Sequence, residues 1–160
     1  RLYQSLQQAS YSTWSDGPFG TQGNEPGKSI SYYDKGPLVG LLFDFEIRNA
    51  TQNKKSLDDV MRSLYRKYYK EKQRGFTEAE IQQTCEEVAG KPMSGMFDYV
   101  YTTKELDYAK YLAYAGLKIE EQTIEKKEKT PAKKFKIIEM ANPTAMQTSI
   151  LKSWMGEKNN

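Results

Sequence analysis

Apolar residues concentrate in one segment of the chain, residues 38–47. Seven of these ten positions carry large apolar side chains: Leu38, Val39, Leu41, Leu42, Phe43, Phe45 and Ile47. A helix that is apolar on nearly every side belongs in the middle of a helical bundle, where neighbours cover it. We therefore predict a central helix within residues 31–51, which would span about 30 Å. Asp44, Glu46 and Arg48 interrupt the apolar run, and a membrane span needs roughly 20 consecutive apolar residues, so this segment is not a transmembrane helix.

Pro37 complicates the start of the central helix, because proline has no N–H to donate and its ring crowds the preceding turn. Two arrangements follow. Either the regular helix starts near Pro37, with proline at the tolerated first position, or the helix is kinked beside Tyr33. Both arrangements place Tyr33 at irregular backbone near a helix N-terminus.

Helical spacing of apolar residues recurs in other parts of the chain. Ser56 with Asp59, and Thr77 with Glu80, form capping patterns that mark two helix starts. The further helices that we predict cover residues 1–14, 56–73, 77–90, 93–101 and 106–115. The intervening residues 16–28 are rich in glycine and proline and form a long loop.

The pattern changes after Gly116. Apolar and charged residues alternate on both sides of a lysine-rich stretch, which predicts two strands joined by an exposed turn. Asn142-Pro143-Thr144 then marks the start of a last helix that ends at Gly156. Residues 157–160 are expected to be a disordered tail. The predicted fold class is mainly α, a helical bundle with a small β-hairpin near the C-terminus.

Composition restricts the range of functions. The 160 residues carry a net charge of +3, which is too small and too evenly spread to indicate a nucleic-acid partner. The basic residues within 62–72 are interpreted as a solvated helix face. The chain has no histidine, the commonest zinc ligand and acid-base group near neutral pH. Cys85, the single cysteine, lies on an apolar helix stripe and is interpreted as a core residue. No complete catalytic constellation is present.

The residues from Ser31 to Tyr65, SYYDKGPLVGLLFDFEIRNATQNKKSLDDVMRSLY, resemble the segment that follows the zinc site in the glycyl aminopeptidase family of thermolysin-like zinc metallopeptidases (gluzincins). In that family a Y-Y-D-K-G run opens a buried helix, and an S-L-D-D-V-M-R helix follows it. QSLQQASYSTW on one side, and GFTEAEIQQTCEEVAG and FDYVYTTKELDYAKYLAYAGL on the other, are also similar to the family. The resemblance covers roughly residues 3–120. It implies that residues 1–116 form the helical C-terminal subdomain of a peptidase catalytic domain.

The resemblance also implies a role for Tyr33. A larger, related family of zinc aminopeptidases has Y-x-K-G at what corresponds to residues 33–36. There the tyrosine hydroxyl donates a hydrogen bond to the oxyanion that forms when zinc-bound water attacks the peptide carbonyl, and a phenol that keeps its proton at neutral pH suits this role. From the residues alone, packing at a helix end is the more common role of such a tyrosine. Pro37 departs from the family, where a small residue is usual.

The metal ligands are expected elsewhere. In the family, the zinc-binding histidines, the general-base glutamate and the glutamate ligand all precede the region that this chain resembles. Because the chain has no histidine and begins at Arg1 without an initiator methionine, we expect a piece of a longer polypeptide. Zinc would then be bound by the full-length parent, and this chain would contribute no metal ligand and be inactive alone.

These observations predict a fragment of a zinc-dependent aminopeptidase that hydrolyses peptides from the N-terminus, with Tyr33 as its catalytic residue, a peptide as substrate, no nucleic-acid partner and no membrane span. Two alternatives stay open. The chain could be a helical interaction module that docks through residues 16–28 or through the basic helix, or its parent could have lost the metal and only bind peptides. Residues 117–156 carry no functional assignment.

Overall fold

A computed structural model of the protein describes residues 4–16, 31–124 and 132–157. The chain forms two compact units, Arg1–Leu106 and Asp107–Asn160. In the described residues the structure is mainly helical, with one small antiparallel hairpin near the C-terminus. The predicted fold class is therefore confirmed.

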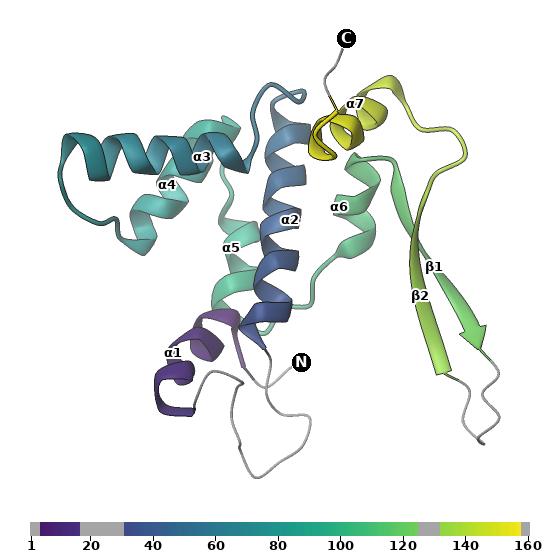
Figure 1. Ribbon diagram of the computed structural model, residues 1–160, viewed down its shortest axis with the longest axis horizontal. Helices are drawn as coiled ribbons and strands as arrows, with labels where there is room; N and C mark the ends of the chain where they lie inside the picture. The colour runs from purple at the N-terminus through teal and green to yellow at the C-terminus, as the bar shows by residue number, and fades with distance from the viewer. Residues whose placement is uncertain (1–3, 17–30, 125–131, 158–160) are drawn as a thin grey trace. The chain divides into compact units, whose positions relative to one another are not determined.

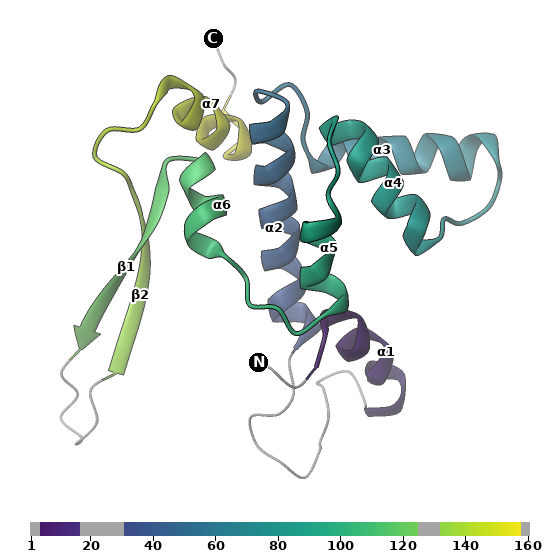
Figure 2. The same cartoon turned by 180° about the vertical axis from the view of Figure 1, so that it is seen from behind.

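The first unit is a helical bundle in which α2 is the common partner. Within this unit α2 packs against each of the other four α-helices, and both views show α5 running alongside it (Figures 1 and 2). The elements are α1 (Leu6–Asp16), α2 (Tyr32–Ala50), α3 (Leu57–Leu64), the π-helix η1 (Tyr65–Glu71), α4 (Glu78–Ala89) and α5 (Ser94–Tyr101). The central position predicted for residues 31–51 is confirmed, and residues 42–47 are all buried.

The helix α2 begins before Pro37, so the predicted alternative of a helix that starts at Pro37 is wrong. Ser31 is the N-cap, and its hydroxyl accepts a hydrogen bond from the Asp34 N–H at 3.3 Å. Pro37 lies inside the helix and is exposed. The carbonyl of Tyr33, which loses a donor to proline, lies in the first turn of the helix, where water can replace the missing hydrogen bond. Tyr33 is thus helical, contrary to the expectation of irregular backbone.

Asp44 joins α2 to α3. Its Oδ2 accepts a hydrogen bond from Arg48 Nε at 2.6 Å, and its Oδ1 accepts one from the backbone N–H of Leu57 at 2.8 Å. Leu57 is the first residue of α3, and a helix leaves its first N–H groups without partners inside the helix. The buried Asp44 carboxylate therefore accepts hydrogen bonds both from the N-terminus of α3 and from the Arg48 guanidinium.

The helix predicted over residues 56–73 is present, but it changes type after Leu64. The Ser56 N–H donates to Asp59 Oδ2 at 2.9 Å, which confirms the predicted start. From Tyr65 the backbone widens into the π-helix η1, and the rings of Tyr65 and Tyr69 stack with centroids 5.1 Å apart. The predicted cap of α4 is also confirmed, because Thr77 Oγ1 accepts from the Glu80 N–H.

The second unit contains α6 (Tyr108–Tyr114), β1 (Leu117–Ile124), β2 (Ala132–Glu139) and α7 (Ala145–Trp154). The strands pair antiparallel, with Leu117 opposite Glu139 and Ile124 opposite Ala132. Gly116 has a φ of +68°, and a Cβ there would lie 2.9 Å from the Cβ of Pro143, so a side chain is excluded for two reasons. Thr144 caps α7, as the sequence predicts.

The contacts divide the chain after Leu106, so α6 belongs with the hairpin, whereas the sequence suggested a division at residues 116 and 117. The helix α6 packs against β1 and α7. Of the predicted loop 16–28, residues 17–28 lie outside the described part of the chain, as do residues 158–160 of the predicted tail. Within the described ranges, every helix is too short or too polar to cross a membrane.

Candidate functional site

Tyr33 occupies the first turn of α2 and presents its side chain to solvent, with 62% of the residue exposed. Two tyrosines meet here. The ring centroids of Tyr32 and Tyr33 lie 4.3 Å apart with an angle of 33° between the planes. The helix directs their Cβ atoms about 100° apart, but long side chains converge beyond Cβ. The two rings therefore meet although their Cβ atoms diverge.

Tyr32 connects Tyr33 to α1. A side-chain hydrogen bond with Tyr33 raises the pKa of Tyr32, with smaller contributions from burial and from the charge of Tyr33, while a hydrogen bond with Thr13 of α1 opposes the shift. A phenol with a raised pKa holds its proton more strongly. The Tyr32 side chain thus connects Tyr33 with α1 by hydrogen bonds. The hydroxyl groups of Tyr32 and Tyr33 form a small polar cluster.

Lys35 lies one helical turn inside the N-terminus of α2 and is partly buried. Burial lowers the pKa of its ammonium group. Among the side chains that the structure describes, no carboxylate forms an ion pair with Lys35. A partly buried cation with no counterion among the described side chains favours an anionic group nearby, and this distinguishes Lys35 from the ion-paired lysines of the first unit.

We expect Lys35 to titrate at a lower pH than Lys104, whose pKa is raised chiefly by its hydrogen bond to Asp98. Reductive ¹³C-methylation followed by NMR titration measures both groups in one sample. The unfolded chain binds the Lys35 proton more tightly than the folded chain does. The free energy of unfolding therefore rises with pH between the lowered pKa of the folded state and the ordinary value of 10.5. A Lys35 resonance that titrates above Lys104 would contradict the assignment.

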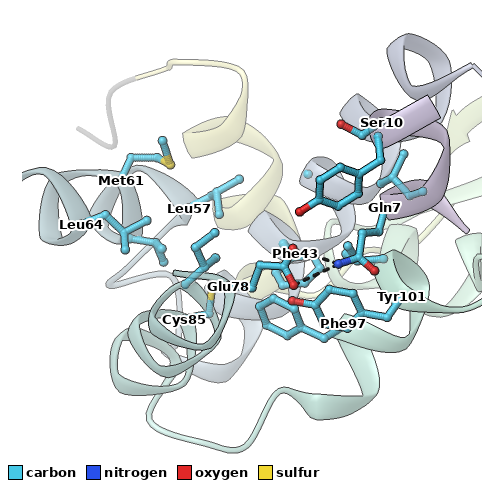
Figure 3. A pocket seen from close by; sticks show the side chains of 16 residues that line it. Gln7, Ser10, Phe43, Leu57, Met61, Leu64, Glu78, Cys85, Phe97 and Tyr101 are labelled. Carbon is cyan, nitrogen blue, oxygen red and sulfur yellow. Dashed lines mark hydrogen bonds between the residues drawn. The ribbon is translucent and has the colours of Figure 1, made fainter. Parts of the chain in front are cut away.

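A second candidate site is an apolar groove within the first unit, with a volume of about 580 Å³ (Figure 3). In Figure 3, Leu57, Met61 and Leu64 lie on one side of the groove and Ser10 and Gln7 on the other. Gly40 and Phe43 of α2 are also among its lining residues. Tyr33 does not line it. The sequence analysis did not identify the groove, because its walls come from five helices.

Polar groups at the groove belong mainly to Gln7 and Glu78. Gln7 Nε2 donates to both carboxylate oxygens of Glu78, at 2.9 and 3.0 Å, and so connects α1 with α4. Tyr101 lies near them, and its pKa is raised by burial and then by the Glu78 charge. Cys85 also lines the groove, is buried, and has a pKa raised to about 11 by burial. A thiol with that pKa is protonated near neutral pH, which agrees with a core cysteine.

The described residues contain no group of side chains that fits a zinc ion. Histidine is absent from the whole sequence. In the described ranges, no three His, Cys, Asp or Glu side chains come together as a metal-binding group. Zinc sites use three or four such ligands, and the described part of the chain brings no such set together.

The fold and these two sites together define a mainly helical protein with a tyrosine pair at one helix end, of which Tyr33 is exposed, and an apolar groove. Comparisons with models of protein families, with curated proteins and with solved structures found no match.

Proposed function

We propose that this chain is the helical C-terminal part of the catalytic domain of a zinc aminopeptidase, and that Tyr33 is its catalytic residue. In this function Tyr33 donates a hydrogen bond to the negatively charged oxygen that develops on the peptide carbonyl. The metal ligands belong to another part of the enzyme, so this chain supplies no step at the metal. The substrate is a peptide with a free N-terminus, and nucleic acid is not a partner.

The exposure of Tyr33 is the observation that carries the proposal. An oxyanion donor must reach a substrate, and a hydroxyl packed among hydrocarbon groups would be useless for this purpose. Tyr33 is 62% exposed and stands at the N-terminal turn of α2. Its position in the Y-D-K-G run at residues 33–36 matches the place of the catalytic tyrosine in the related aminopeptidases that the sequence resembles.

The surroundings of Tyr33 also suit an anionic transition state. The helix N-terminus carries a partial positive charge, and Lys35 adds a cation in the first turn of α2, although positions two apart on a helix do not face each other. Both favour negative charge near the start of α2. Asp34 acts in the opposite sense, but it is exposed and its backbone N–H is held by the Ser31 cap.

Aminopeptidase assays of the complete natural polypeptide that contains this chain test the proposal. We expect hydrolysis of one or more aminoacyl p-nitroanilides, loss of this activity with a chelator, and recovery with zinc. The 160-residue chain alone should be inactive and should show no tight zinc binding by calorimetry. Absence of activity on the complete polypeptide against all twenty aminoacyl substrates would overturn the proposal, as would a stoichiometric zinc site on the 160-residue chain.

The groove favours a second candidate function, a helical interaction module. An aminopeptidase that relied on Tyr33 alone would have no need of an open apolar groove elsewhere in the first unit. The catalytic role and a docking role are compatible, because Tyr33 does not line the groove.

A further inference from the structure

The groove exposes apolar side chains that a folded protein normally covers. Met61 is 56% exposed, and Tyr11 and Tyr101 are also exposed among its lining residues. Contiguous apolar surface of this kind marks interaction sites. The volume of about 580 Å³ lies in the range typical of binding pockets. Methionine is flexible at three torsions, so Met61 can adapt to an apolar partner at the rim.

Gly40 gives the groove its depth on α2. It lies inside a helix, where glycine is unfavourable by about 1 kcal/mol relative to alanine. A Cβ at Gly40 would meet only the Leu57 side chain, at 4.0 Å. Because a larger residue would project into the space beside Leu57, the missing side chain keeps this part of the groove open.

The walls of the groove determine what kind of backbone can occupy it. All sixteen lining residues belong to α-helices, drawn from α1, α2, α3, α4 and α5. Helices satisfy their backbone groups internally and present no free edge of N–H and C=O groups, as a sheet edge does. An extended peptide in the groove would lose water from its backbone without gaining partners. A helical occupant keeps its own backbone hydrogen bonds.

Charge determines the polar face of the occupant. Among the described residues that line the groove, Glu78 is the one that carries a charge, and none is a lysine or an arginine. The groove is therefore locally acidic, although the chain as a whole carries a net charge of +3. A basic residue of the occupant placed against Glu78 is attracted by the Glu78 carboxylate. An acidic occupant would be attracted only by the net positive charge of the whole chain.

We infer that this groove binds an amphipathic α-helix of a partner protein, with its apolar side chains between α1 and α3 and a basic residue against Glu78. Binding in this mode needs two apolar side chains one helical turn apart, at positions i and i+3 or i+4. The inference does not rest on the proposed peptidase function, and it is tested by binding and not by turnover, so the two can fail separately.

A matched pair of peptides tests the inference on the full 160-residue chain. Both are acetylated, amidated and labelled helices of about four turns, or about 14 residues, with leucine at i, i+3, i+4 and i+7; one carries lysine and the other glutamate at the polar positions. Fluorescence anisotropy should show saturable binding of the lysine peptide and binding at least about fivefold weaker for the glutamate peptide. A lysine peptide with the same composition but scrambled leucines should not bind.

Variants of the groove give the second measurement. Gly40→Leu fills the space beside Leu57 and should weaken binding of the lysine peptide at least about tenfold, while Gly40→Ala, the matched control, should change it less than about twofold. Glu78→Gln keeps a partner for Gln7 but removes the charge, and should weaken binding about two- to fivefold. Met61→Lys changes an exposed rim position and should also weaken binding. It keeps the inference testable if Gly40→Leu reduces stability. Circular dichroism checks the fold of each variant.

Three results would overturn the inference. The first is equal affinity for the lysine and glutamate peptides. The second is binding that Gly40→Leu and Met61→Lys leave unchanged. The third is self-association of the chain in analytical ultracentrifugation that Met61→Lys abolishes, which would assign the groove to a second copy of this chain.

Discussion

Replacing Tyr33 with phenylalanine lowers kcat for peptide hydrolysis about a hundred- to a thousandfold in the complete enzyme, if Tyr33 is the oxyanion donor that we propose. Removal of one such donor costs on the order of 3 kcal/mol in the transition state. The substitution removes only a hydroxyl group from a side chain that is 62% exposed. KM should change little, because the hydrogen bond forms with charge that is absent from the bound substrate. Steady-state kinetics on one aminoacyl p-nitroanilide measure both constants.

Two tyrosines provide controls for Tyr33→Phe. Tyr11 is similarly exposed but belongs to α1 and lines the groove, so Tyr11→Phe should leave kcat unchanged. Tyr32→Phe removes the hydrogen-bond partner of Tyr33 and should lower kcat less than about tenfold, since it acts only through the position of Tyr33. The free energy of unfolding of all three variants should stay within about 0.5 kcal/mol of the parent. Wild-type kcat in Tyr33→Phe would remove Tyr33 from the mechanism.

Replacing Asp44 with alanine destabilises the first unit by about 3–5 kcal/mol, the range for removing one member of a buried ion pair. The variant leaves the Arg48 side chain without the carboxylate 2.6 Å away and the Leu57 N–H without its acceptor. Arg48 and Asp44 side chains are only 11% and 12% exposed, so water cannot fully replace either interaction. Urea unfolding measures the loss.

Asp58, an exposed aspartate, is the control that separates the effect of burial on stability from the effect of charge. Asp58 pairs with Arg62 at 3.7 Å, but these side chains are 76% and 70% exposed. Asp58→Ala should therefore change the free energy of unfolding by less than about 0.5 kcal/mol. Asp44→Asn keeps an oxygen acceptor for the Leu57 N–H and should fall between the two alanine variants. If Asp44→Ala and Asp58→Ala lower the free energy of unfolding equally, the buried Asp44 interactions between α2 and α3 contribute no more to stability than a surface ion pair.

The helix starts could be predicted from the sequence because capping is local. Thr77 and Glu80, or Thr144 and the first turn of α7, interact across three residues and need no information from elsewhere in the chain. The π-helix was missed because the wider turn of η1 alters the apolar spacing too little to be visible over seven residues. The sequence leaves the start of α2 open between Pro37 and an earlier residue, since the cost of proline depends on whether water reaches the carbonyl that it leaves unpaired.

The mainly helical class, the central place of α2, the hairpin, and Tyr33 as the candidate for chemistry can all be predicted from the amino-acid sequence. These follow from patterns within about twenty residues, and for Tyr33 from a resemblance carried by adjacent residues. Packing in three dimensions was needed to see that the Tyr32 and Tyr33 rings meet, that Asp44 is buried against the start of α3, and that a groove exists. Its lining runs from Leu6 to Tyr101 on five helices. A surface of that kind arises from packing between distant segments, which local periodicity cannot encode.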